Sequence, residues 1–266
     1  MNAAWQDAAR RLAHACRQRT FAVAVARNGA YLGQACSSAE ILAVLHARFL
    51  DREQDALVLS PAHYALAQFA VLAELGEIPA EDLAAYGDDG ARLEMIPGGG
   101  APGMLFTTGS LAQGLSLGIG LALGRRQLGT PGRVVVFVSD GELEEGQTWE
   151  ALACAAHHRL ESLTVVLDLN GSQVDGDPAE ILGIEPVLDR LLAFGLDAIE
   201  VDGHDLDAIA AALEAPRDGR PRAVACRTRI WQGIPSLQER HNLHFVRFRE
   251  GEAELAAAEL AAGAPA

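Results

Sequence analysis

Two polar side chains follow two apolar runs of this chain at matched places. Asp140 follows the run 133–138 after one serine and begins the segment Asp-Gly-Glu-Leu-Glu-Glu-Gly, and Asn170 comes directly after the run 163–169. The spacing between Asp140 and Asn170 fits one strand–helix–strand unit. Because open α/β folds bind ligands at the carboxyl ends of parallel strands, we expect the Asp140 carboxylate and the Asn170 amide oxygen to lie side by side.

These two side chains and the backbone carbonyl of Ser172 offer three hard oxygen ligands. Such a set suits Mg²⁺ or Ca²⁺ that keeps coordination positions for phosphate oxygens and water. A helix that begins after Gly109 would add backbone N–H donors for the same diphosphate. Asp140-Gly and Asn170-Gly, each taken alone, are ordinary turn signals. Their spacing, with Glu145 and a glycine behind them, favours a metal–diphosphate site.

Apolar runs and amphipathic segments alternate along the chain, which predicts an α/β fold with a doubly wound, mostly parallel sheet and helices on both faces. Strands are expected at 56–59, 133–138, 163–169, 198–201 and 222–227, and helices at 64–74, 111–126, 146–159, 206–214 and after 250. Ser37 and Ser38 are expected to cap a further helix. The Gly-, Pro- and acid-rich segment 76–109 predicts a long ordered loop over a site. We expect residues 1–266 to form one domain with helical extensions at both ends.

Composition excludes several classes of protein. The chain has 21 basic and 36 acidic residues, a net charge of −15, and no lysine, which argues against a nucleic-acid or anionic membrane surface. Four cysteines lie far apart without a CxxC pair, which indicates reduced thiols. Neither a signal peptide nor a membrane span is visible. We expect a cytoplasmic protein with small-molecule ligands.

The run SDGELEEGQTWEALACAAHHRLESLTVVLDLNGSQVDG resembles the thiamine-diphosphate motif of transketolases. Similar segments follow in the same order over nearly the whole chain: GQACSSAEILAVLH, LVLSPAHYALAQFAVLAELG, TTGSLAQGLSLGIGLALG, VDGHD and HNLH. The single Asn170, rather than an Asn pair, favours transketolases over the α subunits of 2-oxo acid dehydrogenases. The resemblance implies the diphosphate-binding domain of the thiamine-diphosphate-binding fold.

The resemblance also implies roles for particular residues. Asp140, Asn170 and the Ser172 carbonyl would hold Mg²⁺ or Ca²⁺, while His63 and His244 would face the reactive carbon of the cofactor and the substrate. Glu145 would lie near the cofactor-activating glutamate of a partner domain. The positions that would contact thiamine diphosphate are Gly109, Ser110, Leu111, Gly141, Glu142, Asn170 and His63. Glu142 and Glu144 are also compatible with the solvated first turn of a helix.

The resemblance covers one of the three domains of a transketolase, and this implies an N-terminal subunit of a split enzyme. Its partner would be a C-terminal transketolase-like subunit with the pyrimidine-binding domain, in an α2β2 heterotetramer. Together they would transfer a two-carbon ketol unit from a ketose or ketose phosphate to an acceptor. Two alternatives stay open: a subunit of a 2-oxo acid decarboxylating acyl or acyloin transferase that uses the same cofactor, and a non-catalytic cofactor-binding scaffold.

Several positions on the substrate side depart from the family pattern. Tyr31 stands where the family has His, Gly98-Gly99-Gly100 replaces a Gly-His-Pro, and the last strand is followed by an Ile-Trp231-Gln-Gly segment instead of a basic glycine turn. Tyr31, Gly99, Trp231 and His241 are therefore substrate-side candidates. Either the substrate is less polar or larger than a simple pentose phosphate, or the family has drifted with unchanged chemistry.

The other histidines are expected to be structural. His14 and His46 fall in amphipathic helices, His157 and His158 lie on the helix after the metal motif, and His204 lies at a turn. A histidine without a partner is seldom catalytic, so we predict packing or surface positions for these five.

Overall fold

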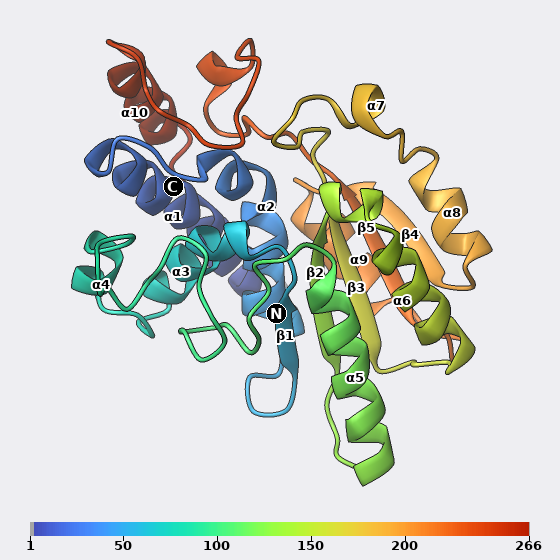
Figure 1. Cartoon of the computed structure of the whole chain (residues 1–266). Helices are drawn as coiled ribbons and strands as arrows, with labels where there is room; N and C mark the ends of the chain where they lie inside the picture. Colours follow the sequence, from blue (N-terminus) through green and yellow to red (C-terminus); the bar gives the residue numbers. More distant parts are fainter. Residues whose placement is uncertain (1–2, 266) are drawn as a thin grey trace.

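The computed structural model describes residues 3–265 and contains a sheet of five parallel strands (Figure 1). The strands are β1 (Ala56–Leu59), β2 (Val134–Ser139), β3 (Leu163–Leu169), β4 (Asp197–Asp202) and β5 (Arg222–Arg227), in the spatial order β1-β2-β3-β5-β4. Every neighbouring pair is parallel. The five predicted strands are confirmed to within one residue at each end. Residues 1, 2 and 266 of the expected domain lie outside the described residues.

Helices cover both faces of the sheet, as predicted. Side chains alternate along a strand, so Val135 and Phe137 of β2 pack into one apolar layer while Val136 and Val138 pack into the other. The first layer contains α1 (Ala3–Ala26), α2 (Leu32–Val44), α3 (Ala65–Glu74) and α9 (Leu206–Glu214), and the second contains α5 (Gln113–Leu128), α6 (Gly146–His157) and α8 (Val187–Ala193). Because β2 and β3 are buried at every position, these two strands are nearly continuous apolar runs in the sequence.

The prediction that Ser37 and Ser38 cap a helix is wrong. α2 begins five residues earlier, at Leu32, and both serines are buried inside it. The Ser38 hydroxyl donates to the backbone carbonyl of Gln34 (2.6 Å), and the Ser37 hydroxyl donates to the Asp168 carboxylate (2.5 Å). An interior serine is stable here because its hydroxyl bonds to the preceding turn or to another element. A π-helical turn, Leu45–Phe49, follows α2.

The connecting segments hold more helix than the sequence predicts. α7 (Pro178–Ile181) and α8 occupy a region with no predicted helix, and α4 (Ala80–Ala84) interrupts the loop 76–109. The C-terminal helix α10 spans Glu252–Ala262, and three short 3₁₀ turns lie at Ala62–Tyr64, Gly141–Glu144 and Pro235–Leu237. Within residues 3–265, no helix is both long enough and apolar enough to cross a membrane.

A third apolar cluster attaches the C-terminal segment to the start of α2. Its buried members are Leu32, Cys36, Ile234, Leu237, Leu243, Val246, Ala256 and Leu260. Ala30 and Val246 exchange backbone hydrogen bonds beside this cluster. The chain after β5 therefore returns to α1 and α2, where α10 also lies (Figure 1), and this return brings His244 to the start of α2.

Candidate functional site

The ends of β2 and β3 bring Asp140 and Asn170 to one edge of the sheet. Ser139 pairs with Asp168 in the strand register, so the residues that follow the two strands are neighbours. One carboxylate oxygen of Asp140 accepts hydrogen bonds from the backbone N–H groups of Asn170 (3.1 Å) and Gly171 (2.8 Å). The expected proximity of Asp140 and Asn170 is therefore present.

The carboxylate of Asp140 is buried without a counter-charge. Among the described residues it forms no ion pair, and the neighbouring carboxylate of Asp168 repels its charge. Burial, followed by this repulsion, raises the pKa of Asp140 to about 7, although N–H groups of Gly171 and Gly141 favour the charged form. A bound cation would stabilise such a carboxylate in its ionised form.

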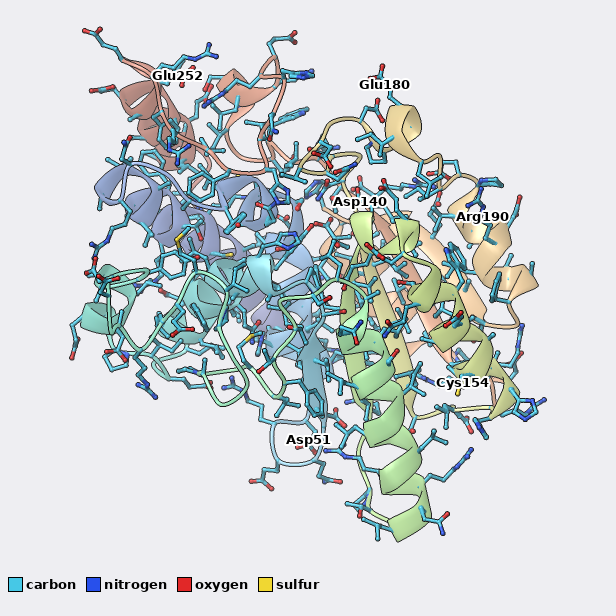
Figure 2. The ribbon with its side chains drawn as sticks, in the orientation of Figure 1. Asp51, Asp140, Cys154, Glu180, Arg190 and Glu252 are labelled. Carbon is cyan, nitrogen blue, oxygen red and sulfur yellow. The ribbon has the colours of Figure 1, made fainter. Side chains whose placement is uncertain are left out.

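Asp140 lines a cavity of about 390 Å³ at the carboxyl edge of the sheet. Figure 2 shows Asp140 at this edge and Asp51 at the opposite one. The other predicted site residues that line the cavity are Tyr31, His63, Gly109, Leu111, Gly141, Glu145, Ser172 and His244. Asn170 lines an adjoining hollow of about 320 Å³ whose wall also includes Asp140. The two hollows thus meet at the Asp140 carboxylate.

The donor atoms around Asp140 suit a hard divalent cation. The amide oxygen of Asn170 accepts the backbone N–H of Ser172 (3.0 Å), so it faces the loop 170–172. Residues 3–265 contain no group of three or more His, Cys, Asp or Glu side chains that could hold a metal. A cation here would therefore depend on Asp140 together with amide and carbonyl oxygens, and this donor set fits Mg²⁺ or Ca²⁺ better than softer metals.

Two histidines from distant parts of the chain lie against each other in the wall of the cavity. The ring centroids of His63 and His244 lie 4.8 Å apart, and the ring of Tyr31 lies 5.7 Å and 5.5 Å from them. Burial, with the neighbouring His244, lowers the pKa of His63 to about 3, and burial also lowers the pKa of His244. Both imidazoles are therefore mainly neutral at pH 7. Each then offers one N–H donor and one acceptor nitrogen to a ligand in the cavity.

Glu142 does not face the cavity, and it does not lie in a solvated helical turn. Its carboxylate is completely buried and accepts hydrogen bonds from Ser60 (2.5 Å), the Ala112 N–H (2.8 Å) and the Ser139 N–H (3.1 Å). Burial raises its pKa to about 7. Glu142 joins the end of β2 to the turn before α5, so it supports the site from behind and does not contact a ligand in the cavity.

Several substrate-side candidates lie away from the cavity. Gly99 is exposed, and its N–H is bonded to the Thr107 hydroxyl (2.8 Å), while His241 is exposed outside the cavity lining. Ser110, which was expected to contact the cofactor, is also exposed outside this lining. Trp231 packs against the C-terminal apolar cluster instead of lining the cavity. Tyr31 is the candidate of this group that lines the cavity, because the N-terminal end of α2 points to it.

The remaining histidines occupy structural or surface positions. His157 and His158 are exposed at the end of α6. His204 is buried, with Nδ1 2.9 Å from the Glu40 carboxylate and Nε2 accepting the backbone N–H of Arg229 (2.9 Å). His204 therefore links its turn to Glu40 on α2 and to the segment after β5, as expected for a structural histidine.

Gln34 lines the cavity and was not among the predicted residues. It is 1% exposed, its amide nitrogen lies 2.9 Å from Nδ1 of His244, and its amide oxygen has no partner among the described residues. An unpaired buried amide oxygen beside a cavity is available to a ligand that donates a hydrogen bond. The sequence indicates Gln34 only once the start of α2 is known, since it then lies in the first turn beside Tyr31.

A family model described as "Transketolase, thiamine diphosphate binding domain" matches residues 9–264. A transketolase family protein of Sinorhizobium fredii, itself uncharacterized, is 38% identical over 234 residues, which cover 84% of each chain. One subunit of the apulose-4-phosphate transketolase of Actinobacillus succinogenes is 32% identical over 242 residues, which cover 87% of this chain and 88% of that protein. The solved transketolase of Campylobacter jejuni is similar with a TM-score of 0.88 at 24% identity, covering 98% of this chain and 43% of that chain. This chain thus spans less than half of that solved protein.

Proposed function

Because this chain belongs to the transketolase family, whose thiamine diphosphate binding domain it matches over nearly its whole length, we propose that it is the diphosphate-binding subunit of a two-chain transketolase-like enzyme. The enzyme transfers a two-carbon ketol unit from a ketose or ketose phosphate to an acceptor. The observation that carries this proposal is the cavity in which the unpaired Asp140 carboxylate and two neutral histidines meet.

The residues around Asp140 fit the cofactor and its metal. Asp140, the Asn170 amide oxygen and the Ser172 carbonyl would hold Mg²⁺ or Ca²⁺, and the backbone at Gly109, Leu111 and Gly141, which line the cavity, would contact thiamine diphosphate. Thiamine diphosphate, when bound, supplies the electron sink that the cleavage of a carbon–carbon bond next to a ketone requires. The single metal and the backbone N–H groups let a chain of net charge −15 bind an anionic diphosphate.

His244 and His63 act as hydrogen-bond donors or proton-transfer groups at the substrate oxygens. The amide nitrogen of Gln34 is a donor, so Nδ1 of His244 accepts its hydrogen bond and Nε2 carries the ring proton. Nε2 of His244 therefore donates to an oxygen of the substrate. His63, neutral and 4.8 Å away between ring centroids, is the second proton donor or acceptor. Neither ring contributes a positive charge at neutral pH.

A second chain completes the site. Glu145 lines the cavity, and in the proposed assembly it would lie near the cofactor-activating glutamate of the partner's pyrimidine-binding domain. The relative from Actinobacillus succinogenes is named as one subunit of an apulose-4-phosphate transketolase, which supports a division into two chains. We assign the assembly to an α2β2 heterotetramer. We assign it to the cytoplasm because Cys16, Cys36, Cys154 and Cys226 are all free thiols.

Reconstitution with the partner tests the proposal. Purified chain is mixed with the pyrimidine-domain protein, thiamine diphosphate and Mg²⁺, and ketol transfer from ketose phosphates to an aldehyde acceptor is measured with Asp140→Ala beside the wild type. We expect at least a hundredfold loss of activity in Asp140→Ala, because the metal loses its only charged ligand from this chain. Asp89→Ala, which removes an exposed carboxylate in a loop, is the control and retains wild-type activity. Full activity of Asp140→Ala would contradict the metal site.

The same reconstitution separates the other functions. Release of CO₂ from 2-oxo acids without ketol transfer would indicate the decarboxylating transferase. Binding of thiamine diphosphate without turnover of either substrate class would indicate a cofactor-binding scaffold.

A further inference from the structure

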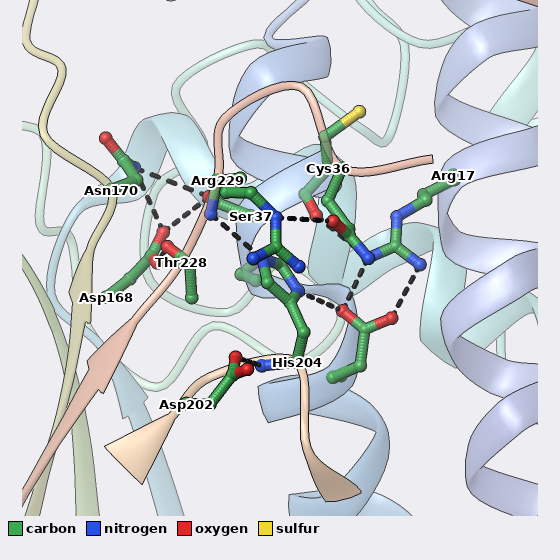
Figure 3. A network of polar contacts seen from close by, with 12 residues as sticks. Arg17, Cys36, Ser37, Asp168, Asn170, Asp202, His204, Thr228 and Arg229 are labelled. Atoms are coloured by element: carbon green, nitrogen blue, oxygen red, sulfur yellow. Dashed lines mark hydrogen bonds and ion pairs between the residues drawn. The ribbon is translucent and has the colours of Figure 1, made fainter. Parts of the chain in front are cut away.

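A buried polar cluster lies directly behind Asn170. At its centre is Asp168, the sixth residue of β3, whose side chain has no exposed surface and does not line the cavity. One carboxylate oxygen accepts hydrogen bonds from the hydroxyls of Ser37 (2.5 Å) and Tyr64 (2.8 Å) and from the Asn170 amide nitrogen (3.1 Å). The other oxygen accepts the hydroxyl of Thr228. The cluster thus joins α2, β3, the 3₁₀ turn before α3 and the segment after β5 (Figure 3).

This cluster fixes the orientation of the Asn170 amide. The amide nitrogen points to Asp168 and also lies 3.0 Å from the Tyr64 hydroxyl, while the amide oxygen points away from Asp168 (Figure 3) and accepts the N–H of Ser172. Rotation of the amide by 180° would set its oxygen against the Asp168 carboxylate and its nitrogen against the Ser172 N–H. Both hydrogen bonds would become unpaired contacts in a buried place, which is costly.

We propose that Asp168 is a positioning residue that holds Asn170 with its amide oxygen turned toward the metal. This inference rests on the proposed function, since it concerns the cation that Asp140 and Asn170 hold. Asp168 does not bind the metal itself, because both of its oxygens already accept hydrogen bonds and its side chain lies outside the cavity lining. Residues behind a metal ligand commonly change metal affinity by about 10–100-fold when they are replaced.

Three substitutions separate positioning from simple stabilisation. Asp168→Leu removes the charged acceptor that faces the Asn170 amide nitrogen and leaves only hydroxyl oxygens, such as that of Tyr64, near it. Asp168→Asn is the conservative rescue, because its amide oxygen can still accept from Asn170 while its amide nitrogen donates to the Thr228 hydroxyl. Thr228→Val removes the contact to the other oxygen of Asp168 and leaves the Asn170 contact intact, so it is the matched control.

The main measurement is the Mg²⁺ concentration that gives half-maximal binding of thiamine diphosphate to the complex of the full chain and its partner, by calorimetry. We expect Asp168→Leu to need about 10-fold or more Mg²⁺. Asp168→Asn and Thr228→Val should stay within about threefold of the wild type. If Asp168→Leu needs the same Mg²⁺ concentration as the wild type, the positioning role of Asp168 is overturned, and the proposed function is not affected. A wild-type complex that binds no thiamine diphosphate at any Mg²⁺ concentration would overturn the proposed function.

A second measurement needs neither metal nor a folded Asp168→Leu variant. In the wild-type chain without cofactor, the side-chain NH₂ of the half-buried Asn170 should exchange its protons with water slowly, because it is bonded to the buried Asp168 carboxylate and the Tyr64 hydroxyl. Its NMR signal is assigned from its absence in Asn170→Ala. Slow exchange that persists in Thr228→Val supports the fixed amide, whereas rapid exchange in the wild type would overturn it.

Discussion

His46 is a half-buried histidine that the cofactor site does not use. It lies on the π-helical turn after α2, where its Nε2 is 3.2 Å from the Gln68 side-chain oxygen and its Nδ1 has no partner among the described residues. It lines a separate cavity of about 600 Å³ that contains no residue of the metal motif. Burial lowers the pKa of His46 to about 4. The folded protein therefore holds this ring neutral at pH values at which the unfolded chain protonates it.

The lowered pKa makes His46 a source of acid sensitivity. The unfolded chain binds a proton near the ordinary histidine pKa of about 6.5, so stability falls as the pH drops from there through the folded-state pKa of about 4. Between pH 7.5 and 5 we expect the wild type to lose about 2 kcal/mol more unfolding free energy than His46→Gln. Urea unfolding at both pH values measures this difference. His157→Gln, at an exposed histidine, should behave as the wild type, and equal losses in wild type and His46→Gln would contradict the prediction.

Tyr31 is a residue-scale test of substrate choice. Its ring packs edge-on against His244 and Phe245, with centroids 5.5 Å and 5.2 Å apart, and so forms an aromatic wall beside both histidines of the cavity. The resemblance to transketolases implies an imidazole at this position, which would offer a polar donor to a sugar hydroxyl. The change to Tyr31 therefore favours a less polar substrate group beside His63 and His244.

Restoring the imidazole should shift the donor profile. We expect Tyr31→His to raise kcat/KM for ordinary ketose phosphates by about tenfold, the value of one added hydrogen bond. Tyr31→Phe keeps the ring packing and serves as the control for loss of the phenol hydroxyl. Initial rates with a panel of ketose donors measure the profile. A donor profile that Tyr31→His leaves unchanged would favour family drift with the same chemistry.

At the scale of elements, the glycines of α5 have two different roles. A Cβ on Gly114 would lie 2.5 Å from the Cα of Ser60, whereas a Cβ on Gly124 would have no heavy atom within 4 Å. Gly114 therefore allows α5 to pack closely on the turn after β1. The Glu142 carboxylate also holds this turn, because it accepts the hydroxyl of Ser60 (2.5 Å).

Alanine at these two positions should change stability in opposite directions. Gly114→Ala forces α5 away from Ser60, and we expect a loss of about 1–3 kcal/mol with weaker cofactor binding. Gly124→Ala, at an open helical position, should stabilise the chain by about 1 kcal/mol, because alanine is the better helix former. Thermal and urea unfolding of both variants measure the difference. If Gly114→Ala leaves the free energy of unfolding unchanged, Ser60 must be able to move away from the added Cβ at little cost, which would contradict the prediction.

The parts of the fold that could be predicted are the buried strands, because burial requires continuous apolar residues. β2 and β3 are buried on both faces, so their apolar runs and the polar residues Asp140 and Asn170 after them could be predicted with their spacing. The start of α2 could not be predicted, because serine is a common helix N-cap residue. Ser37 instead lies inside the helix, where its hydroxyl bonds to a carboxylate on β3. Trp231 was misplaced for a similar reason: its position in a motif does not tell which way a loop side chain points.

At the scale of the whole molecule, the cavity is bordered by apolar side chains that face solvent. Ile96, Val174, Ile181 and Leu182 are between 43% and 59% exposed, and the first three line the cavity itself. Exposed apolar groups around a ligand cavity are typical of a surface that another protein covers. The rim therefore supports a partner that closes the cavity from outside, as the proposed pyrimidine-domain subunit would.

Charge on this rim should separate the two chains. The 266-residue chain alone should show no turnover with thiamine diphosphate, because the activating glutamate comes from the partner. With the partner present, Val174→Glu and Leu182→Glu should raise the partner concentration needed for half-maximal activity by about tenfold or more, since a charge would be buried against an apolar surface. Leu128→Glu places the same charge at the far end of α5, where the side chain is 81% exposed, and should leave that concentration unchanged. Activity titrations and analytical ultracentrifugation measure both effects. Turnover by the chain alone would contradict the two-chain enzyme, and equal shifts in all three variants would mean that net charge, and not the rim, controls association.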